Sequence, residues 1–287
     1  MDYEGQICRS PMERGSFMLP VSVGCSYNRC HFCSLFKHLK YRELPVEEIE
    51  AELKRVKNLG GMPPSVFLGD GNAFGLPVSH LAGILSLIHD YFPDCAAVNM
   101  DATVTSILKK TDGELSMLYR AGVRHLCVGI ECGLDDVLKR MEKDHDMAEA
   151  AEAVRRLSRA GILYDAHIMT GIAGHGRGAE NAEALAAFFN RTKPSRIINF
   201  SLFIDKSTAL YDDIEAGEFT PADELENIRE ERQLLSQLET EGLSYDGFHD
   251  FVTLRVRGRL PEDRDRMLQT LDTAIAKHCG EGAVAYA

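Results

Sequence analysis

Three cysteines, Cys25, Cys30 and Cys33, lie close together in the stretch VGCSYNRCHFC, and no other cysteine follows for about sixty residues. Cysteine thiolates bind zinc ions and iron–sulfur clusters. A structural zinc ion takes four ligands, and His31 or His38 could supply the fourth, so a zinc-containing barrel enzyme is one interpretation. A 4Fe–4S cluster normally takes four cysteines, so three would leave one iron open to a substrate or cofactor.

Short apolar segments that favour strands alternate with segments punctuated as helices, for example by Pro45 and Gly60. This alternation predicts βαβ units and a parallel sheet, and six units favour an open, partial (β/α)6 barrel of the α/β class. The expected strands are residues 16–24, 65–72, 96–102, 124–133, 162–174 and 195–203, and the expected helices are residues 45–60, 77–92, a stretch ending at 121, 146–161 and 179–191.

The alternation stops after Phe203, which divides the chain into three expected regions. These are an N-terminal extension over residues 1–15, the barrel over 16–203, and a C-terminal extension over 204–287. The last region contains a charged helix between residues 221 and 242, one strand-like run FVTLRVR, and a final helix from Pro261. We expect it to pack on the barrel.

One face of successive expected strands is polar. Because side chains alternate between the faces of a strand, apolar residues such as Leu126 and Val128 fall on the face that helices must cover. The polar face then lines the interior, which is costly unless the residues satisfy one another or surround a ligand. A ligand cavity at the carboxyl ends of the strands is the interpretation we prefer. The polar positions are Asn99, Asp101, His125, Cys127, Glu131, Asp165, His167, Asn199 and Ser201.

Composition restricts the class of protein. The 287 residues carry a net charge of −12, which argues against a long nucleic-acid track because such a track needs a basic stripe. No apolar run approaches the ~20 residues of a membrane span, and the N-terminus lacks the apolar region of a signal peptide. We therefore expect a cytoplasmic protein with reduced thiols and without membrane or nucleic-acid partners.

The cysteine loop resembles that of the radical S-adenosylmethionine (SAM) superfamily. The commonest spacing in the superfamily is C-x3-C-x2-C, whereas this chain has C-x4-C-x2-C with Phe32 before the last cysteine, similar to a smaller set with GC-x-x-N-x-C-x-F-C loops. The resemblance implies a partial (β/α)6 radical SAM barrel in which Cys25, Cys30 and Cys33 hold a 4Fe–4S cluster. The fourth iron would be chelated by the amino and carboxylate groups of SAM.

Further motifs resemble the family in register. FLGDGN stands where the family has its glycine-rich motif for the methionine amino group, which implies cofactor binding by Gly69, Asp70 and Gly71. VGIECG ends the fourth strand, so the resemblance makes Glu131 the ligand of the ribose hydroxyls. GIAG, from Gly171 to Gly174, follows the fifth strand, where family members place backbone against adenine.

The resemblance also implies the reaction and its partners. The reduced cluster would cleave SAM to a 5′-deoxyadenosyl radical, which abstracts hydrogen from a substrate, and a low-potential donor such as flavodoxin or ferredoxin would supply the electron. An iron–sulfur protein for electron transfer or cluster delivery is an alternative, but it would need no polar interior.

A small anionic metabolite is the substrate that we expect. In the C-terminal run FHDFVTLRVRGRLPEDR, Arg255, Arg257 and Arg259 share one face of a strand and could clamp a carboxylate or phosphate. A charged edge strand that blocks aggregation explains the same pattern. The candidate substrate residues are Asp165, His167, Asn199, His249, Arg255 and Arg257, and Lys143 and His145 could approach the cavity rim.

Overall fold

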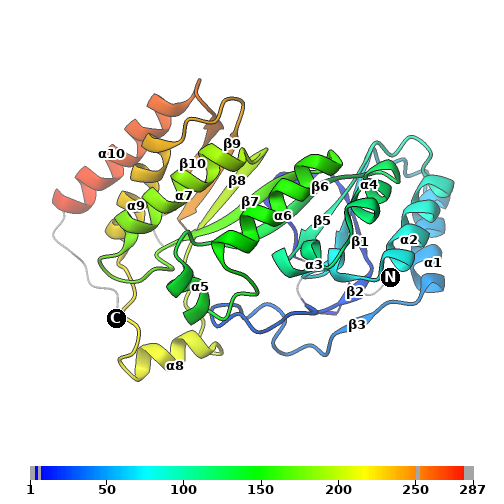
Figure 1. Ribbon diagram of the computed structural model, residues 1–287, viewed down its shortest axis with the longest axis horizontal. Helices are drawn as coiled ribbons and strands as arrows, with labels where there is room; N and C mark the ends of the chain where they lie inside the picture. Colours follow the sequence, from blue (N-terminus) through cyan, green and yellow to red (C-terminus); the bar gives the residue numbers. More distant parts are fainter. Residues whose placement is uncertain (1–3, 6–7, 250–252, 281–287) are drawn as a thin grey trace. The chain divides into compact units, whose positions relative to one another are not determined.

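A mostly parallel sheet organises the chain in the computed structural model, which describes residues 4–5, 8–249 and 253–280 (Figure 1). The pairs β1–β4, β4–β5, β5–β6 and β8–β9 are parallel, whereas β9–β10 is antiparallel. The order of strands across the sheet is β1 (Phe17–Pro20), β4 (Ser65–Gly69), β5 (Ala97–Ala102), β6 (Val123–Glu131), β7 (Leu163–Thr170), β8 (Arg196–Ser201), β9 (Ser244–His249) and β10 (Leu254–Arg259). The predicted α/β class with parallel strands is confirmed.

Helices follow the strands along the chain, as the sequence predicts for βα units. They are α1 (Val46–Asn58), α2 (Val78–Tyr91), α3 (Val104–Leu108), α4 (Asp112–Arg120), α5 (Asp135–Arg140), α6 (Met147–Ala160), α7 (Gly178–Thr192), α8 (Ala209–Glu215), α9 (Glu224–Gln237) and α10 (Arg264–Gly280), with short 3-10 turns η1 (Pro11–Glu13) and η2 (Ala73–Gly75). A second, two-stranded sheet pairs β2 (Ser22–Val23) with β3 (Arg42–Glu43).

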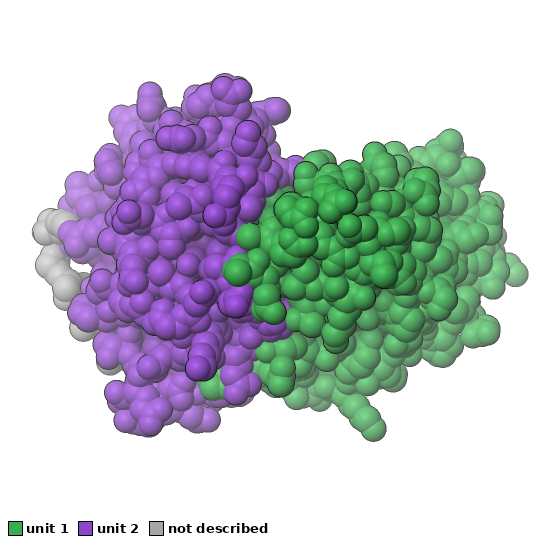
Figure 2. All heavy atoms as spheres, in the orientation of Figure 1, with its two compact units in different colours: residues 1–129, 148–165 green, residues 130–147, 166–287 purple. Residues whose placement is uncertain are grey.

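The chain divides into two compact units, coloured separately in Figure 2. Unit 1 comprises residues 1–129 and 148–165, and unit 2 comprises residues 130–147 and 166–287. In unit 1, α2 buries Leu81, Leu85 and Ile88 at helical spacing, which places one apolar stripe of the helix in the core.

Unit 2 contains the long helices α7 and α9. Phe189 of α7 and Leu235 of α9 have no exposed surface. Asp223 caps α9 by accepting a hydrogen bond from the backbone of Glu226, whose carboxylate accepts one from the backbone N–H of Asp223. This reciprocal capping fixes where α9 begins, and therefore which of its side chains face α7.

The six predicted barrel strands and most of the helices between them are present at the expected positions. The prediction of one strand in the C-terminal extension is wrong, because β9 precedes β10 and pairs with β8, which continues the sheet beyond residue 203. β9 has the sequence SYDGFH, whose polar residues hide its burial, and Asp246 and His249 are buried only because charged side chains pair with them. The predicted strand FVTLRVR begins partly outside the described residues.

Candidate active site

The cysteine loop of unit 1 is closed at its base by the small sheet. Val23 of β2 pairs with Arg42 of β3, so the chain leaves and returns at one point. Within the loop, Asn28 adopts a left-handed conformation (φ 47°), and its side-chain amide donates to the carbonyl of Phe36 at 2.9 Å. Asparagine tolerates this backbone conformation better than most residues, which explains its place in the middle of the motif.

The three cysteines are half-buried on this loop and form no disulfide bond. The backbone N–H of Cys33 donates to the carbonyl of Cys30 at 3.3 Å, which makes a tight turn between these two thiols. In the described part of the chain, no three His, Cys, Asp or Glu side chains are gathered as ligands of one metal ion. The cysteines of an iron–sulfur cluster each bind a different iron, so a cluster does not require such convergence.

The glycine turn after β4 packs directly on the cysteine loop. A Cβ atom at Gly71 would lie 2.7 Å from Cβ of Cys25 and 2.9 Å from Cε2 of Phe36, so only glycine fits there. The side-chain amide of Asn72 donates to the hydroxyl of Ser26 at 2.9 Å. Two segments that sequence reasoning treated as separate motifs are therefore in contact within unit 1.

Asp70 lies buried in the same turn, between Gly69 and Gly71. Burial raises the pKa of its carboxyl to about 6, against the lowering effect of hydrogen bonds from the backbones of Gly24 and Gly71. Asn72 also holds the turn from the other side, since its Oδ1 accepts a hydrogen bond from the backbone of Thr103 at 3.0 Å. Its role was missed in the sequence, where Asn72 is only the last letter of FLGDGN.

The polar interior of unit 1 is a connected network. Asn99 donates to the carboxylate of Glu13 at 3.0 Å and accepts from the backbone of His125 at 3.0 Å. Nδ1 of His125 lies 3.2 Å from Oδ1 of Asp165, which is 1% exposed. The predicted juxtaposition of polar residues from successive strands is thus present, and Glu13 of the N-terminal extension completes it.

Glu131 ends β6 in unit 2 with a left-handed backbone (φ 62°), which is rare for a residue with a long side chain. Its carboxylate pairs with the ammonium group of Lys143 at 3.1 Å, and both side chains are largely buried. Strained backbone of this kind persists only where surrounding contacts enforce it. The pair with Lys143 places this lysine beside the proposed ribose ligand.

The GIAG loop after β7 turns through two left-handed glycines, Gly171 (φ 83°) and Gly174 (φ 82°). The backbone N–H of Gly174 donates to the carbonyl of Gly171 at 3.0 Å. A Cβ atom at Gly171 would collide with Oδ1 of Asn227 on α9, and one at Gly174 would lie 3.0 Å from a ring carbon of Phe219. Glycine is therefore required at both positions, because the backbone is left-handed there and because α9 and the segment before it pack closely against the loop.

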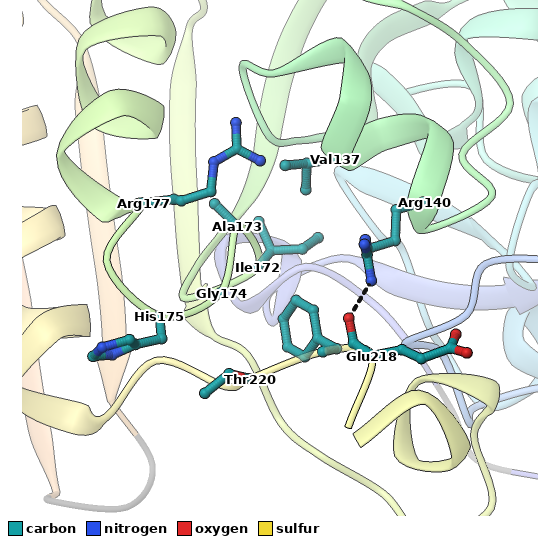
Figure 3. A pocket seen from close by; sticks show the side chains of 10 residues that line it. Val137, Arg140, Ile172, Ala173, Gly174, His175, Arg177, Glu218 and Thr220 are labelled. Carbon is teal, nitrogen blue, oxygen red and sulfur yellow. Dashed lines mark hydrogen bonds between the residues drawn. The ribbon is translucent and has the colours of Figure 1, made fainter. Parts of the chain in front are cut away.

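A cavity of about 250 Å³ lies beside the GIAG loop in unit 2 (Figure 3). Val137 and Ile172 give it an apolar wall, and the side chains of Arg140 and Arg177 lie on opposite sides of Val137 in Figure 3. Arg177 pairs with Asp136, whereas Arg140 donates to the carbonyl of Glu218 at 2.7 Å. Sequence reasoning did not find this cavity, because its wall joins three separate segments.

The candidate substrate residues of the C-terminal extension are engaged with their neighbours. His249 is 1% exposed, and its ring nitrogens lie 2.7 Å from a carboxylate oxygen of Glu224 and 2.6 Å from one of Glu231. Arg255 forms two hydrogen bonds with Asp246 and covers the ring of Phe248. These contacts give His249 and Arg255 structural roles in β9 and β10, and their contact with a substrate stays a prediction.

The remaining candidates lie on strands. Asn199 of β8 is fully buried, and its Oδ1 accepts a hydrogen bond from the backbone of Thr170 at 3.1 Å. His167 of β7 meets the ring of Phe200 edge-on. Arg257 lies on the exposed face of β10 and forms no ion pair within the described residues.

The fold and the cysteine loop define a partial α/β barrel protein with a set of thiols suited to an iron–sulfur cofactor. Residues 19–189, more than half of the chain, match the family model of the Radical SAM superfamily. The chain belongs to this superfamily, whose enzymes use a 4Fe–4S cluster and SAM. Membership favours the radical SAM interpretation of the cysteine loop over the zinc-containing barrel and the cluster-carrier protein.

Known relatives agree in fold and differ in what they act on. The anaerobic magnesium-protoporphyrin IX monomethyl ester cyclase of Cereibacter sphaeroides is 28% identical over 154 residues, which cover 53% of this chain and 24% of the relative. The hydrogenase maturase HydG of Carboxydothermus hydrogenoformans superposes with a TM-score of 0.58 at 16% identity, covering 90% of this chain and 57% of HydG. Methylornithine synthase (PylB) gives a TM-score of 0.56 at 15% identity, covering 92% and 81%.

The chain spans less than half the length of the curated relatives that it matches. No helix in the described residues has both the length and the apolar character needed to cross a membrane. The residues of the cysteine loop fit the family's cluster, because three thiols stand on one closed loop and Gly71 contributes no side chain beside Cys25.

Proposed function

We propose that Cys25, Cys30 and Cys33 hold the 4Fe–4S cluster, one iron to each thiolate, and that the enzyme removes a hydrogen atom from a small anionic metabolite. The observation that carries the assignment is the contact between Gly71 and Cys25, where a single methyl group would not fit. This contact joins the cysteine loop to the glycine turn, the two segments that the resemblance assigns to the cluster and to the methionine end of SAM.

In unit 1, Gly69, Asp70 and Gly71 bind the methionine part of SAM. Asp70 is a buried carboxylate on a turn that otherwise offers backbone atoms, so it supplies negative charge where SAM brings an ammonium group and a sulfonium. When bound, the cluster and SAM supply a 5′-deoxyadenosyl radical, which is the group that abstracts hydrogen. The protein residues bind, orient and exclude water.

In unit 2, Glu131 accepts hydrogen bonds from the ribose hydroxyls, and the loop from Gly171 to Gly174 contacts adenine through its backbone. Lys143 holds the carboxylate of Glu131 in one orientation while leaving its second oxygen for the ribose. Glycines permit the close approach of backbone to a flat base.

The substrate contacts polar side chains that the sequence places on one face of successive strands, namely Asp165, His167 and Asn199. An anionic substrate draws support from Arg257, which has no acidic partner in the described part of the chain, whereas Asp246 already neutralises Arg255. The relatives act on different substrates, so likeness to them selects none. A flavodoxin or ferredoxin supplies the electron.

The test is anaerobic reconstitution of the cluster, followed by SAM and dithionite, with 5′-deoxyadenosine measured by mass spectrometry. We expect 5′-deoxyadenosine from the wild-type protein. Cys30→Ala should lose iron and the absorbance of the cluster, because it removes one of three thiolates. Cys95→Ala is the matched control, since Cys95 is buried, lies outside the cysteine loop and hydrogen-bonds to backbone groups such as the carbonyl of Ala97.

Full iron content in Cys30→Ala would overturn the ligand assignment. An intact cluster that yields no 5′-deoxyadenosine, with or without candidate anionic metabolites, would overturn the proposed reaction. The same run should be searched for methylthioadenosine, whose appearance would show that another bond of the sulfonium is cleaved.

A further inference from the structure

In unit 2, Glu230 and Asn181 link the loop after β6 and the GIAG loop by hydrogen bonds. The carboxylate of Glu230 on α9 accepts a hydrogen bond from the backbone N–H of Gly171 at 2.9 Å through Oε2. Its other oxygen, Oε1, accepts one from the side-chain amide of Asn181 on α7 at 2.6 Å. Oδ1 of Asn181 accepts in turn from the backbone N–H of Gly133 at 2.8 Å and from the thiol of Cys132 at 3.0 Å.

These bonds connect the segment that follows Glu131 with the start of the GIAG loop. Asn181 has no exposed surface, and Glu230 is 3% exposed. Gly178 lets the carboxylate of Glu230 come close, because a Cβ atom there would lie 2.9 Å from Oε2. The position of Glu230 is therefore set by contacts on both of its sides.

Burial of this carboxylate is costly for folding. Burial raises the pKa of Glu230 to about 7, although the hydrogen bonds from Gly171 and Asn181 oppose the change. An apolar residue would fill the same space without this cost, but it could not accept two hydrogen bonds with fixed directions. The arrangement is suited to fixing the geometry of two loops rather than to adding stability.

We propose that Glu230 and Asn181 are positioning residues for SAM, and that together they hold Glu131 and the GIAG loop in one fixed relation. The inference rests on the proposed function, in which these two loops contact the ribose and the adenine. Neither residue touches SAM in this proposal. They act on the left-handed backbone at Glu131 and Gly171, which needs support from neighbouring groups to persist.

The direction of each hydrogen bond gives a sharp test. In Glu230→Gln, one acceptor oxygen is replaced by an NH2 group, which is a donor. This NH2 group then faces another donor, either the N–H of Gly171 or the side-chain NH2 of Asn181. Flipping the side-chain amide of Asn181 would let it accept the hydrogen bond from the new amide at position 230, but it would place the NH2 group of Asn181 against the N–H of Gly133. In Asn181→Asp, two carboxyl groups face each other across the 2.6 Å contact, so they either repel each other or take up a proton that restores the contact.

The double variant Glu230→Gln with Asn181→Asp reverses the central bond and satisfies every group again. The amide oxygen at position 230 accepts from Gly171, its nitrogen donates to the carboxylate at position 181, and that carboxylate accepts from Gly133. The net charge of the pair is unchanged. If the two side chains only filled space, the double variant would not recover the affinity for SAM that the single variant loses.

The experiment measures the dissociation constant of SAM on the reconstituted protein, together with iron content and urea unfolding. We expect Glu230→Gln to weaken SAM binding about tenfold or more, as for the loss of a hydrogen bond to a charged group, and the double variant to return to within about threefold of wild type. Iron content should not change, because the cysteines belong to unit 1.

Asn190→Asp is the matched control on the same helix. Asn190 donates to the carbonyl of Gln237 and accepts from the backbone of Glu239, so it anchors α7 to the end of α9 away from both loops. This control should lose stability and keep its affinity for SAM. If affinity follows stability across all of these variants, the two residues are structural and the proposal is wrong.

A double variant that fails to fold, or that binds SAM no better than Glu230→Gln, would also overturn the proposal, because its hydrogen bonds are complete by design. Failure of the proposed function looks different. In that case wild-type protein would not bind SAM at all, or Glu131→Ala would bind it as tightly as wild type does.

Discussion

His249 should make unit 2 less stable as the pH rises from about 7 to about 9. Burial by itself lowers the pKa of this imidazole, but the hydrogen bonds and charges of Glu224 and Glu231 outweigh burial and raise it to about 9. The folded protein therefore keeps a proton that the unfolded chain releases near its ordinary pKa of 6.5. The stability that this proton contributes is fully present below the pKa of His249 in the unfolded chain. It is lost as the pH rises through the pKa of His249 in the folded protein.

The size of the effect follows from the two pKa values. A difference of ~2.5 units corresponds to roughly 3 kcal/mol, since each unit is worth ~1.4 kcal/mol. Between pH 7 and pH 9 the protonation equilibria of the two states imply a loss of about 2 kcal/mol in the free energy of unfolding.

The assay must separate His249 from other groups that titrate in this range. Lys110 is buried in unit 1, and burial lowers its pKa to about 8, so its contribution to stability rises with pH and opposes that of His249. We therefore compare wild type with His249→Gln by urea unfolding at both pH values. The difference between the two proteins should shrink by about 2 kcal/mol from pH 7 to pH 9.

His175→Gln is the control, because His175 pairs with Glu226 at 2.9 Å but is largely exposed. Its difference from wild type should not change measurably over the same range, since exposed pairs contribute little. A direct NMR titration of the imidazole of His249 covers the case in which His249→Gln does not fold. A titration midpoint near 6.5, or a constant difference between wild type and His249→Gln, would refute the reasoning.

Two further predictions concern unit 1. Gly71→Ala should displace the cysteine loop and lower iron content after reconstitution, whereas Gly83→Ala on the exposed face of α2, where nothing lies within 4 Å, should keep iron and add about 1 kcal/mol of stability. Burial disfavours the ammonium group of Lys110, and its hydrogen bond to the carbonyl of Phe74 offsets part of that cost, so wild type should gain stability relative to Lys110→Met as the pH rises from 7 to 9 in urea unfolding. The exposed Lys109→Met is its control and should show no such change with pH, so equal changes in both variants would contradict this account.

The alternation of strands and helices was sufficient to predict the barrel strands, because βα units repeat a pattern that is local in sequence. It failed at β9, where burial depends on partners that are distant in the chain. Asp246 and His249 look like surface residues until Arg255 and Glu231 are placed beside them. A polar strand of this kind has no local sequence signal.

The same distinction separates the parts of the candidate site. The spacing of the cysteines predicts the cluster loop because all three proposed ligands lie on one short segment. The contact of Gly71 with Cys25 could not be predicted, since the two residues lie far apart in the sequence and meet where β1 pairs with β4. Asn181 and Glu230 carry no motif, and their importance follows only from the backbone groups that they reach.

The role of α9 changes how the family match should be interpreted. The match ends at residue 189, before α9 begins at Glu224. Yet Glu230 supplies the acceptor for Gly171, and through Asn181 it supports the segment after Glu131, and both of these segments lie inside the match. Glu230→Ala would leave a buried N–H and a buried amide without this acceptor, at a cost of about 1–3 kcal/mol for each. In this chain, the two loops that we propose bind SAM therefore depend on a helix that lies outside the family match.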